Sequence, residues 1–583
     1  ECLRRTRSES EQAKAVTTVA LNRPDLMLEA LRSKTTKANG WVKHVPTPLA
    51  EVDRKLLKRG KTTDGTRTLI RCMLDNDNLF AQENGLLVLA QALLRTPGIQ
   101  KRLSEGLDAS QIILRCEEWE RIHSVPAATD FLKVELTSAS GTQNPMYETP
   151  LWVAEERAWL YGLGRILRAA LTGEFDFTSR RYLVTEEVGR YFGLRSTWYK
   201  RRFGMLNSGT GLLDEPTPIS PWLSGLLSTL LQWPGVEFRA NDAAAAGNAN
   251  TPEELLALIE QRAAEQRALY GSRSRTPMYV MPASEDDAPL SDRPLRVAIV
   301  QPLRPRRDDF DAKDPTHWTK GMLAEHRRHL AAVCRLAEQQ LRTWASARSN
   351  VGTDEGPLVD IVLFPELSVH PEHVGLLRRL SDKLKANVFA GLTFVHSDKV
   401  GGPINQGLWL IRSATAAHGR SIQYVWQGKL HPMKLERAMG IKPYRPHVTL
   451  VELPIGTKSP TRIAAAICYD ATDLDLVADL RTKSDVFLVA ALNQDVQTFD
   501  NMVAALHFHM YQPVILANSG EFGGSTAQVP LPKHERLVAH VHGSNQIAVS
   551  VFEVDPAPFK STTTPKAAKE LKAPPAGYKG RPN

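Results

Sequence analysis

The chain has 583 residues, of which 42% are hydrophobic and 23% are charged, a balance typical of a globular protein. This length is too great for one hydrophobic core, so about two to four domains are expected. The net charge of +9 favours acidic partners, nucleic acid among them, although a basic surface without a specific partner explains it equally well.

Several classes of protein are disfavoured. The longest apolar run, at residues 85–90, ends at Gln91 and is far shorter than the ~20 residues of a membrane-spanning helix. The five cysteines form neither a CxxC pair nor a cluster with histidine at zinc spacing, so no disulfide framework or structural metal is expected. A reducing cytoplasm fits this cysteine usage best. The chain starts with Glu1 and without a signal-peptide pattern, which predicts a part of a longer polypeptide or a processed product.

Residues 1–270 carry a helical pattern. Apolar residues recur at three- and four-residue intervals in residues 25–31, 85–94 and 151–171. Another helix is expected to begin at Thr251, because Pro252 suits a first turn and Glu254 completes a capping box. We therefore predict a mostly α-helical region.

Residues 184–202 resemble a helix-turn-helix. Two short amphipathic helices would meet at Gly193, and the second ends in a basic and aromatic run suited to phosphate contacts. Lys200, Arg201 and Arg202 are therefore candidate nucleic-acid-binding residues. The turn is about one residue short of the motif, and a basic helical hairpin that reads no bases explains the same pattern.

The pattern changes after residue 270. Residues 271–294 are rich in Ser, Arg, Pro and acidic residues without a sustained apolar period, which predicts a linker. In residues 295–555 apolar runs of strand length alternate with helical stretches, so an α/β domain with helices covering the sheet is expected. Residues 556–583 form a basic tail rich in Pro and Lys, which we expect to be disordered or loosely packed.

Three strand ends of this α/β region carry reactive groups. Cys468 ends the apolar run 464–467, Glu366 follows the run 360–364, and Lys429 follows the run 422–426. A thiol has an ordinary pKa of about 8.5, so a nucleophilic cysteine needs a base, which a carboxylate can supply. A lysine can stabilise the oxyanion that forms when sulfur attacks a carbonyl or nitrile carbon. Each residue alone also has a plain structural explanation: Cys468 as a buried core cysteine, Glu366 as part of a helix start, and Lys429 as a solvated lysine.

The joint pattern in residues 295–555 resembles the nitrilase, or carbon–nitrogen hydrolase, superfamily. The matching segments are residues 296–301, 362–366, 429–437 and 467–470, with Glu, Lys, Glu and Cys in the family's order. The resemblance implies catalytic roles for Glu366, Lys429, Glu436 and Cys468, with Lys434 as a weaker rival for the lysine. It implies a four-layer α-β-β-α sandwich that forms homo-oligomers, with no metal or organic cofactor.

The same resemblance implies that the substrate is a small-molecule amide or nitrile. Asn405 stands where the family tends to keep an asparagine, and Tyr469 and Asn493 are the other candidate substrate-binding residues. The turn after Cys468 departs from the Arg-Phe-Pro-Glu type common in the family, so the substrate is not identified.

The whole arrangement resembles the C-terminal part of a bacterial antiphage-defence protein that fuses a reverse transcriptase to a nitrilase domain. Residues 1–270 would then connect to the polymerase or contact nucleic acid, and any reverse transcriptase activity would lie outside this chain. The sequence lacks a palm motif with paired aspartates after Tyr or Phe. The alternative is a nucleic-acid-associated defence protein in which the nitrilase fold is a non-catalytic assembly or sensing module.

Overall fold

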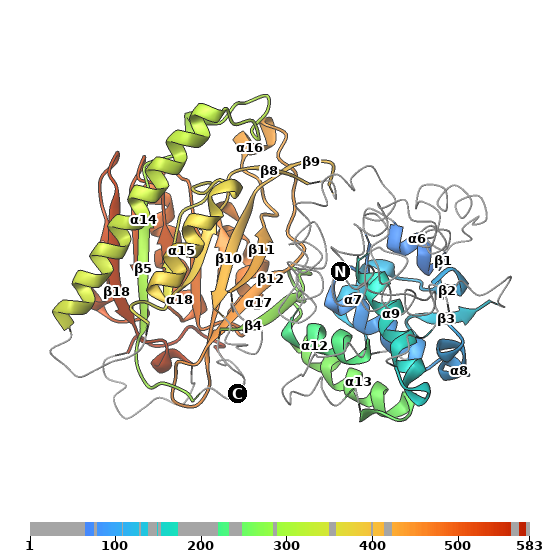
Figure 1. Ribbon diagram of the computed structural model, residues 1–583. Coiled ribbons are helices and arrows are strands. Elements are labelled where there is room, and N and C mark those ends of the chain that lie inside the picture. The colour runs from blue at the N-terminus through green and yellow to red at the C-terminus, as the bar shows by residue number, and fades with distance from the viewer. Residues whose placement is uncertain are drawn as a thin grey trace, which may run out of the picture. The chain divides into compact units, whose positions relative to one another are not determined.

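The computed structural model divides the chain into two compact units, Glu1–Ala268 and Leu269–Asn583, each with its own hydrophobic core (Figure 1). The structure describes residues 65–74, 78–107, 109–127, 130–137, 149, 153–172, 220–231, 246, 248–283, 289–348, 357–397, 400–412, 422–560 and 571–578. Among the helices in these ranges, none is both long and apolar enough to cross a membrane.

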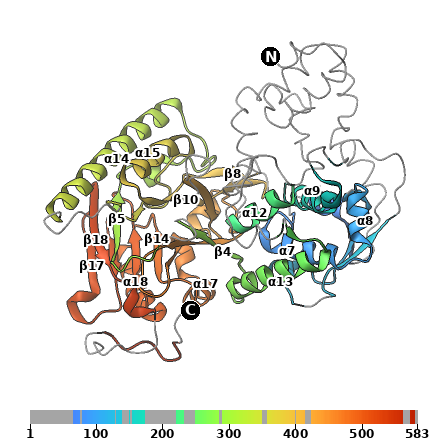
Figure 2. The same cartoon turned by 60° about the horizontal axis from the view of Figure 1, so that its bottom comes forward.

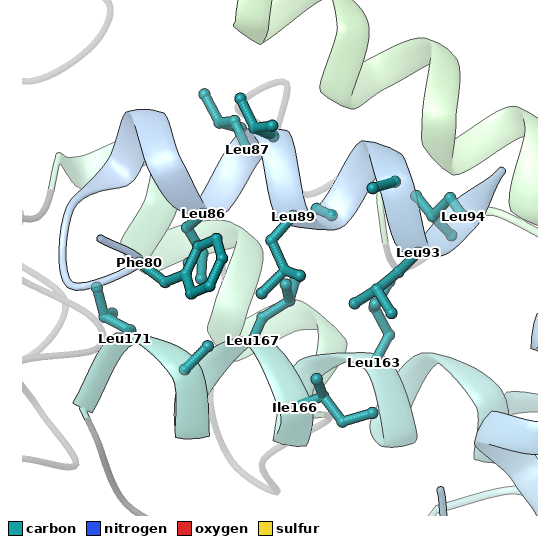
Figure 3. Packing of buried hydrophobic residues seen from close by; sticks show 14 of the residues in the cluster. Phe80, Leu86, Leu87, Leu89, Leu93, Leu94, Leu163, Ile166, Leu167 and Leu171 are labelled. Atoms are coloured by element: carbon teal, nitrogen blue, oxygen red, sulfur yellow. The ribbon is translucent and has the colours of Figure 1, made fainter. Parts of the chain in front are cut away.

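The described part of the N-terminal unit is built mainly from helices, as predicted. They are α6 (Leu69–Leu74), α7 (Glu83–Leu94), α8 (Ile99–Ser104), α9 (Ala158–Thr172), α12 (Pro221–Leu230) and α13 (Pro252–Leu269). Figure 3 shows the centre of its core, where Leu89 and Leu93 of α7 lie against Leu167 and Leu163 of α9. At the start of α13 the backbone N–H of Glu254 donates to Oγ1 of Thr251 over 3.2 Å, which is the expected cap.

A small antiparallel sheet in this unit was not predicted. Its strands β1 (Thr66–Thr68), β2 (Ile112–Arg115) and β3 (Lys133–Leu136) pair in the order β1-β2-β3. Strands of three or four residues are too short for a period of two to stand out beside the helical pattern around them.

The C-terminal unit contains two large sheets. The six-stranded sheet has the order β11-β10-β7-β6-β5-β18, and the seven-stranded sheet has the order β17-β16-β15-β14-β13-β12-β4. The strands of the first sheet are β5 (Leu295–Gln301), β6 (Ile361–Leu363), β7 (Asn387–Gly391), β10 (Gln406–Arg412), β11 (Ile422–Gly428) and β18 (Ala548–Val554). Those of the second are β4 (Met278–Pro282), β12 (Val448–Leu453), β13 (Thr461–Ile467), β14 (Val486–Ala490), β15 (Val514–Ala517), β16 (Ser525–Gln528) and β17 (Leu537–Val541).

The layers follow from which residues share a core. On β5, Val297 and Ile299 pack with the seven-stranded sheet, whereas Ala298 and Val300 pack beneath α14 (Lys320–Arg348) and α15 (Val374–Leu384). Successive strand residues point to opposite faces, so these apolar runs are covered on both sides. The helices α17 (Leu474–Leu480) and α18 (Val496–Met510) supply further core residues to the seven-stranded sheet, and Figures 1 and 2 both show α14 and α15 side by side. The predicted α-β-β-α sandwich is confirmed.

Part of the predicted linker belongs to this sandwich. Strand β4 lies within residues 271–294 and pairs in parallel with β12, with Met278 opposite Val448. Met278, Tyr279 and Met281 are fully buried. The sequence interpretation gave weight to the flanking prolines and to the polar residues on either side, and so missed a five-residue edge strand.

The described part of the tail also packs on the C-terminal unit. Phe559 is buried, and the hydroxyl of Tyr511 donates to the carbonyl of Lys572 over 2.6 Å. The hydroxyl of Tyr578 donates to the carbonyl of Phe559 over 2.7 Å. Aromatic residues and local backbone contacts therefore hold residues 556–560 and 571–578, which the overall Lys and Pro content did not indicate.

Candidate active site

The thiol of Cys468 stands at the carboxyl end of β13. This strand consists of buried apolar residues apart from Thr461 and Arg462, and it lies between β12 and β14 in the seven-stranded sheet. Cys468 has a φ of +46°, a conformation that few residues with a side chain adopt, and it begins a 3₁₀ turn, Cys468–Thr472. The turn holds the thiol nearly buried at the strand end, whereas the next side chain, Tyr469, is 39% exposed.

Glu366 comes from the other sheet. It follows β6 after Phe364 and Pro365, and Leu367 has a φ of +54°. A side chain on Gly391 of β7 would place its Cβ 2.3 Å from Cα of Glu366, so only glycine leaves room for this turn. One carboxylate oxygen of Glu366, Oε2, accepts the backbone N–H of Leu492 over 3.0 Å. Because Leu492 follows β14, the base is held by both sheets.

Lys429 lies between two carboxylates. It follows β11, and its Nζ donates to Oε1 of Glu366 over 2.7 Å and to Oε2 of Glu436 over 2.5 Å. Glu436 belongs to the short helix α16 (Lys434–Ala438) and also accepts the backbone N–H of Met433 over 2.7 Å. Lys429 is 1% exposed, whereas Lys434 is exposed at the start of α16. The structure therefore brings Glu366, Lys429, Glu436 and Cys468 together and leaves Lys434 outside.

Asn405 joins the same cluster. Its side-chain Nδ2 donates to Oε1 of Glu366 and to Oε1 of Glu436, in each case over 2.7 Å. The predicted role was substrate binding, but the amide nitrogen is turned toward two carboxylates of the protein itself. The residue is fully buried.

Asn493 does not reach the cluster. Its Nδ2 donates to the carbonyl of Asp495 over 3.0 Å, and its Oδ1 accepts the backbone N–H of Asp495 over 3.1 Å. Its own backbone N–H donates to Oδ1 of Asn518 over 2.9 Å. The side chain thus shapes the turn before α18, and the backbone N–H of the preceding residue, Leu492, is what contacts Glu366.

A second buried network, which the sequence did not indicate, ties the Cys468 turn to the loop after Lys429. Asp470 accepts the backbone N–H groups of Leu430 and His431 over 2.9 and 2.8 Å, and Nη1 of Arg445 over 3.0 Å. Nη2 of Arg445 donates to Oδ2 of Asp473 over 3.0 Å. Asp470 could have been singled out from the sequence, because it lies only two residues after the cysteine. Nothing around Arg445 in the sequence distinguishes that residue.

Burial and charge set the protonation of the site. Burial, together with the carboxylate of Glu366, raises the pKa of the Cys468 thiol well above its ordinary value. Burial also raises the pKa of Glu366, and Glu436 adds to that shift while Lys429 opposes it. Burial disfavours the ammonium of Lys429, but the negative charges of Glu366, Cys468 and Glu436 together outweigh burial, and the pKa of the lysine is raised. The resting site therefore holds a neutral thiol that interacts with Glu366, beside a charged lysine.

Two further predictions concern metal ligands and nucleic-acid-binding residues. Within the ranges that the structure describes, no group of three or more His, Cys, Asp or Glu side chains is arranged to hold a metal ion. Lys200, Arg201 and Arg202, with the whole segment 184–202, lie outside those ranges.

The fold and the cluster together define a class: an α-β-β-α sandwich with a cysteine, a glutamate and a lysine gathered at its strand ends. No family model and no curated protein matches the sequence. Among solved structures, a double mutant of the amidase from Nesterenkonia sp. AN1 in complex with acrylamide is similar, with 13% identity, a TM-score of 0.31, and coverage of 45% of this chain and 91% of that one.

Two further solved structures are similar to the same extent. Nit3 of Saccharomyces cerevisiae, a member of branch 10 of the nitrilase superfamily, is 14% identical with a TM-score of 0.32, covering 46% of this chain and 92% of its own. XC1258 of Xanthomonas campestris, a CN-hydrolase superfamily protein with an arsenic adduct in its active site, is 14% identical with a TM-score of 0.31, covering 45% and 91%.

Proposed function

We propose that the C-terminal unit is a cysteine-dependent carbon–nitrogen hydrolase of the amidase or nitrilase type, acting on a small-molecule amide or nitrile. One observation carries the proposal. A thiol, a carboxylate and an ammonium from three separate strand ends meet in one buried cluster, with Lys429 Nζ 2.7 Å from Glu366 Oε1 and the thiol of Cys468 interacting with Glu366. Burying charged groups is costly, and a purely structural strand end has no need of it.

The first half of the reaction with an amide uses all three groups. The S–H bond of Cys468 breaks as its proton passes to Glu366, and sulfur forms a bond to the carbonyl carbon. The carbonyl electrons move to oxygen, giving an oxyanion. An ammonium has three hydrogens, and Lys429 uses two of them on Glu366 and Glu436, so the third is available to the oxyanion.

The second half returns the site to its starting state. The carbon–nitrogen bond breaks, and the amine leaves with the proton held by Glu366, which produces a thioester on Cys468. Water then attacks the thioester carbon and gives a proton to Glu366. When the carbon–sulfur bond breaks, the carboxylic acid leaves and Glu366 returns the proton to sulfur.

Covalent labelling tests the proposal. 2-Chloroacetamide presents an amide and an alkylating carbon, and mass spectrometry locates the adduct. Wild type and Cys334→Ala are expected to carry one adduct on the peptide that contains Cys468, and Cys468→Ala none. Cys334 is a matched control, because it is buried on α14 and burial raises its pKa to about 12.

A panel of simple amides and nitriles, read out by ammonia release, tests turnover with the same variants. Wild type and Cys334→Ala are expected to hydrolyse at least one compound that Cys468→Ala does not. Equal labelling of wild type and Cys468→Ala, or equal ammonia release, would refute the proposal.

A link to nucleic acid and antiphage defence, with homo-oligomers formed through the sandwich, stays a prediction from the resemblance. The net charge of +9 is the observation that favours nucleic acid. Binding of RNA and single-stranded DNA should weaken as salt rises, because phosphate contacts release counterions. A flat salt response, or unchanged binding when Lys200, Arg201 and Arg202 are all replaced by alanine, would contradict it.

A further inference from the structure

The orientation of the Asn405 amide is determined by charge. Nδ2 carries two hydrogens and contacts one oxygen of Glu366 and one of Glu436. The opposite orientation would set Oδ1 against both carboxylates, which is repulsive. Oδ1 itself is buried and has no hydrogen-bond partner among the residues that the structure describes. Leaving a buried acceptor unpaired costs free energy, so the contact of Nδ2 with both acids outweighs that cost.

Counting hydrogen bonds shows what this orientation does to Glu366. Each carboxylate oxygen offers two lone pairs. Oε1 of Glu366 already accepts two hydrogens, one from Lys429 Nζ and one from Asn405 Nδ2. Oε2 accepts the backbone N–H of Leu492, which leaves one lone pair. The thiol of Cys468 is the remaining group that interacts with Glu366, and the open lone pair on Oε2 can accept its proton.

We propose that Asn405 is a positioning residue that fills Oε1 of Glu366 and so directs the Cys468 proton to Oε2. This inference rests on the proposed function. In the step concerned, the S–H bond breaks and an O–H bond forms at Oε2, and no other proton moves. Without the Asn405 donor, Oε1 has a free lone pair on the side of Glu436, and a proton held there bridges the two acids instead of reaching the leaving amine.

The backbone of Asn405 contributes to the same arrangement. Its carbonyl accepts the backbone N–H of Lys429 over 3.0 Å, where β10 and β11 pair. The residue therefore fixes the lysine through its main chain and both partners of the lysine through its side chain. The titratable groups around Glu366 are Lys429, Glu436 and Cys468, and Asn405 is the uncharged member of the set.

The test is the pH profile of alkylation of Cys468 by 2-chloroacetamide. Asn405→Asp keeps the size of the side chain but adds a third acid, so the cluster retains an extra proton near neutral pH. We expect the alkylation rate at neutral pH to be at least ~10-fold lower. The acid limb of the pH profile, where the rate falls as pH decreases, should move to higher pH by about one unit or more. Asn405→Ser has only one donor hydrogen, so a smaller upward shift is expected, and it decides the question if Asn405→Asp does not fold.

Asn387→Ser is the matched control. Asn387 is also buried in the six-stranded sheet, but its Nδ2 donates to the carbonyl of Asp360 and its Oδ1 accepts the backbone N–H of Arg412. Its substitution is expected to lower stability without moving the acid limb. A uniform loss of rate in Asn405→Asp and Asn405→Ser, with the wild-type pH profile retained, would show a merely structural role and overturn the inference. Failure of the wild-type protein to be alkylated at Cys468 would instead overturn the proposed function.

Discussion

The thiol of Cys468 shares its site with the carboxyl groups of Glu366 and Glu436 and the amine of Lys429. The number of protons that these groups hold determines when the thiol can react. If every acid and base were ionised, Glu366 and Glu436 would outweigh the single ammonium of Lys429 by one negative charge. Such an excess is unfavourable where water is excluded, and it opposes formation of a third anion on sulfur. The thiol therefore loses its proton only as Glu366 gains it, which couples activation to the attack on a substrate.

The acid side of the wild-type pH profile should lie above that of an ordinary glutamate. Burial raises the pKa of Glu366, and the base works only when ionised, so activity falls as pH drops through that raised pKa. We expect loss of 2-chloroacetamide reactivity to begin well above pH ~4.3, the value for an exposed glutamate.

Glu366→Gln keeps the shape but cannot accept the proton, so ammonia release from the best amide of the panel is expected to fall by at least ~100-fold. An acid limb near that of an exposed carboxylate, or full turnover by Glu366→Gln, would contradict this assignment of the base.

Single residues of the site differed in how well the sequence predicted them. Glu366, Lys429 and Cys468 follow apolar runs and belong to motifs, so their type and order were readable. The donor role of Asn405 was not, because it depends on two carboxylates that lie 39 and 31 residues away in the chain. The N–H of Leu492 is a main-chain group, and any residue type except proline supplies it.

At the scale of elements, turns rather than strand interiors place the reactive groups. Cys468 and Leu367, next to Glu366, both have positive φ, which costs free energy for residues with side chains. The preceding strands, β13 and β6, are each paired with a neighbouring strand on both sides. This pairing keeps the two turns in their unfavourable conformation. Such turns demand room for their backbone, and Gly391 provides it for Glu366.

Gly391→Ala should therefore affect both stability and reactivity. Its Cβ would lie 2.3 Å from Cα of Glu366 and 2.7 Å from the carbonyl oxygen of Pro365, so backbone must move. We expect the free energy of unfolding to fall by about 1–3 kcal/mol and 2-chloroacetamide to react more slowly at Cys468.

The matched control for this substitution is Gly375→Ala on α15, where an added Cβ meets nothing within 4 Å. It should leave the reaction rate unchanged and stabilise by up to about 1 kcal/mol. Equal rates for the two variants would contradict the steric account of the Glu366 turn.

For the whole molecule, the two units have separate cores, and this separation can be measured. Glu83 of α7 is fully buried and accepts Nε and Nη2 of Arg262 on α13 over 2.9 and 2.7 Å. Glu83→Ala removes the fully buried one of the two acids that pair with Arg262, while the more exposed Glu265 remains, which should destabilise the N-terminal unit by about 1.5–3 kcal/mol.

Hydrogen exchange of the full chain should then rise in peptides from α7 and α13 and not in those from β13, and alkylation of Cys468 should keep its rate. A slower alkylation would show that the sandwich depends on the N-terminal core.

The apolar runs of residues 295–555 predicted strands covered by helices, and the resemblance to the nitrilase superfamily supplied the four-layer sandwich. The sequence predicted less of the N-terminal unit, where short strands such as β1 carry little pattern. The edge strand β4 was lost among polar residues and prolines, since one partner strand, β12, supplies all of its pairing and local composition does not reveal it.

The placement of nucleophile and base in different sheets has a consequence for folding. Cys468 ends a strand of the seven-stranded sheet, whereas Glu366, Asn405 and Lys429 follow or precede strands of the six-stranded one. Neither sheet alone places Glu366 beside the thiol, so in a partly folded chain Cys468 has only the slow reactivity of an ordinary exposed thiol with a pKa near ~8.5. During refolding, fast alkylation at Cys468 should appear only when the two sheets close on each other, which makes this one side chain a reporter of the final packing step.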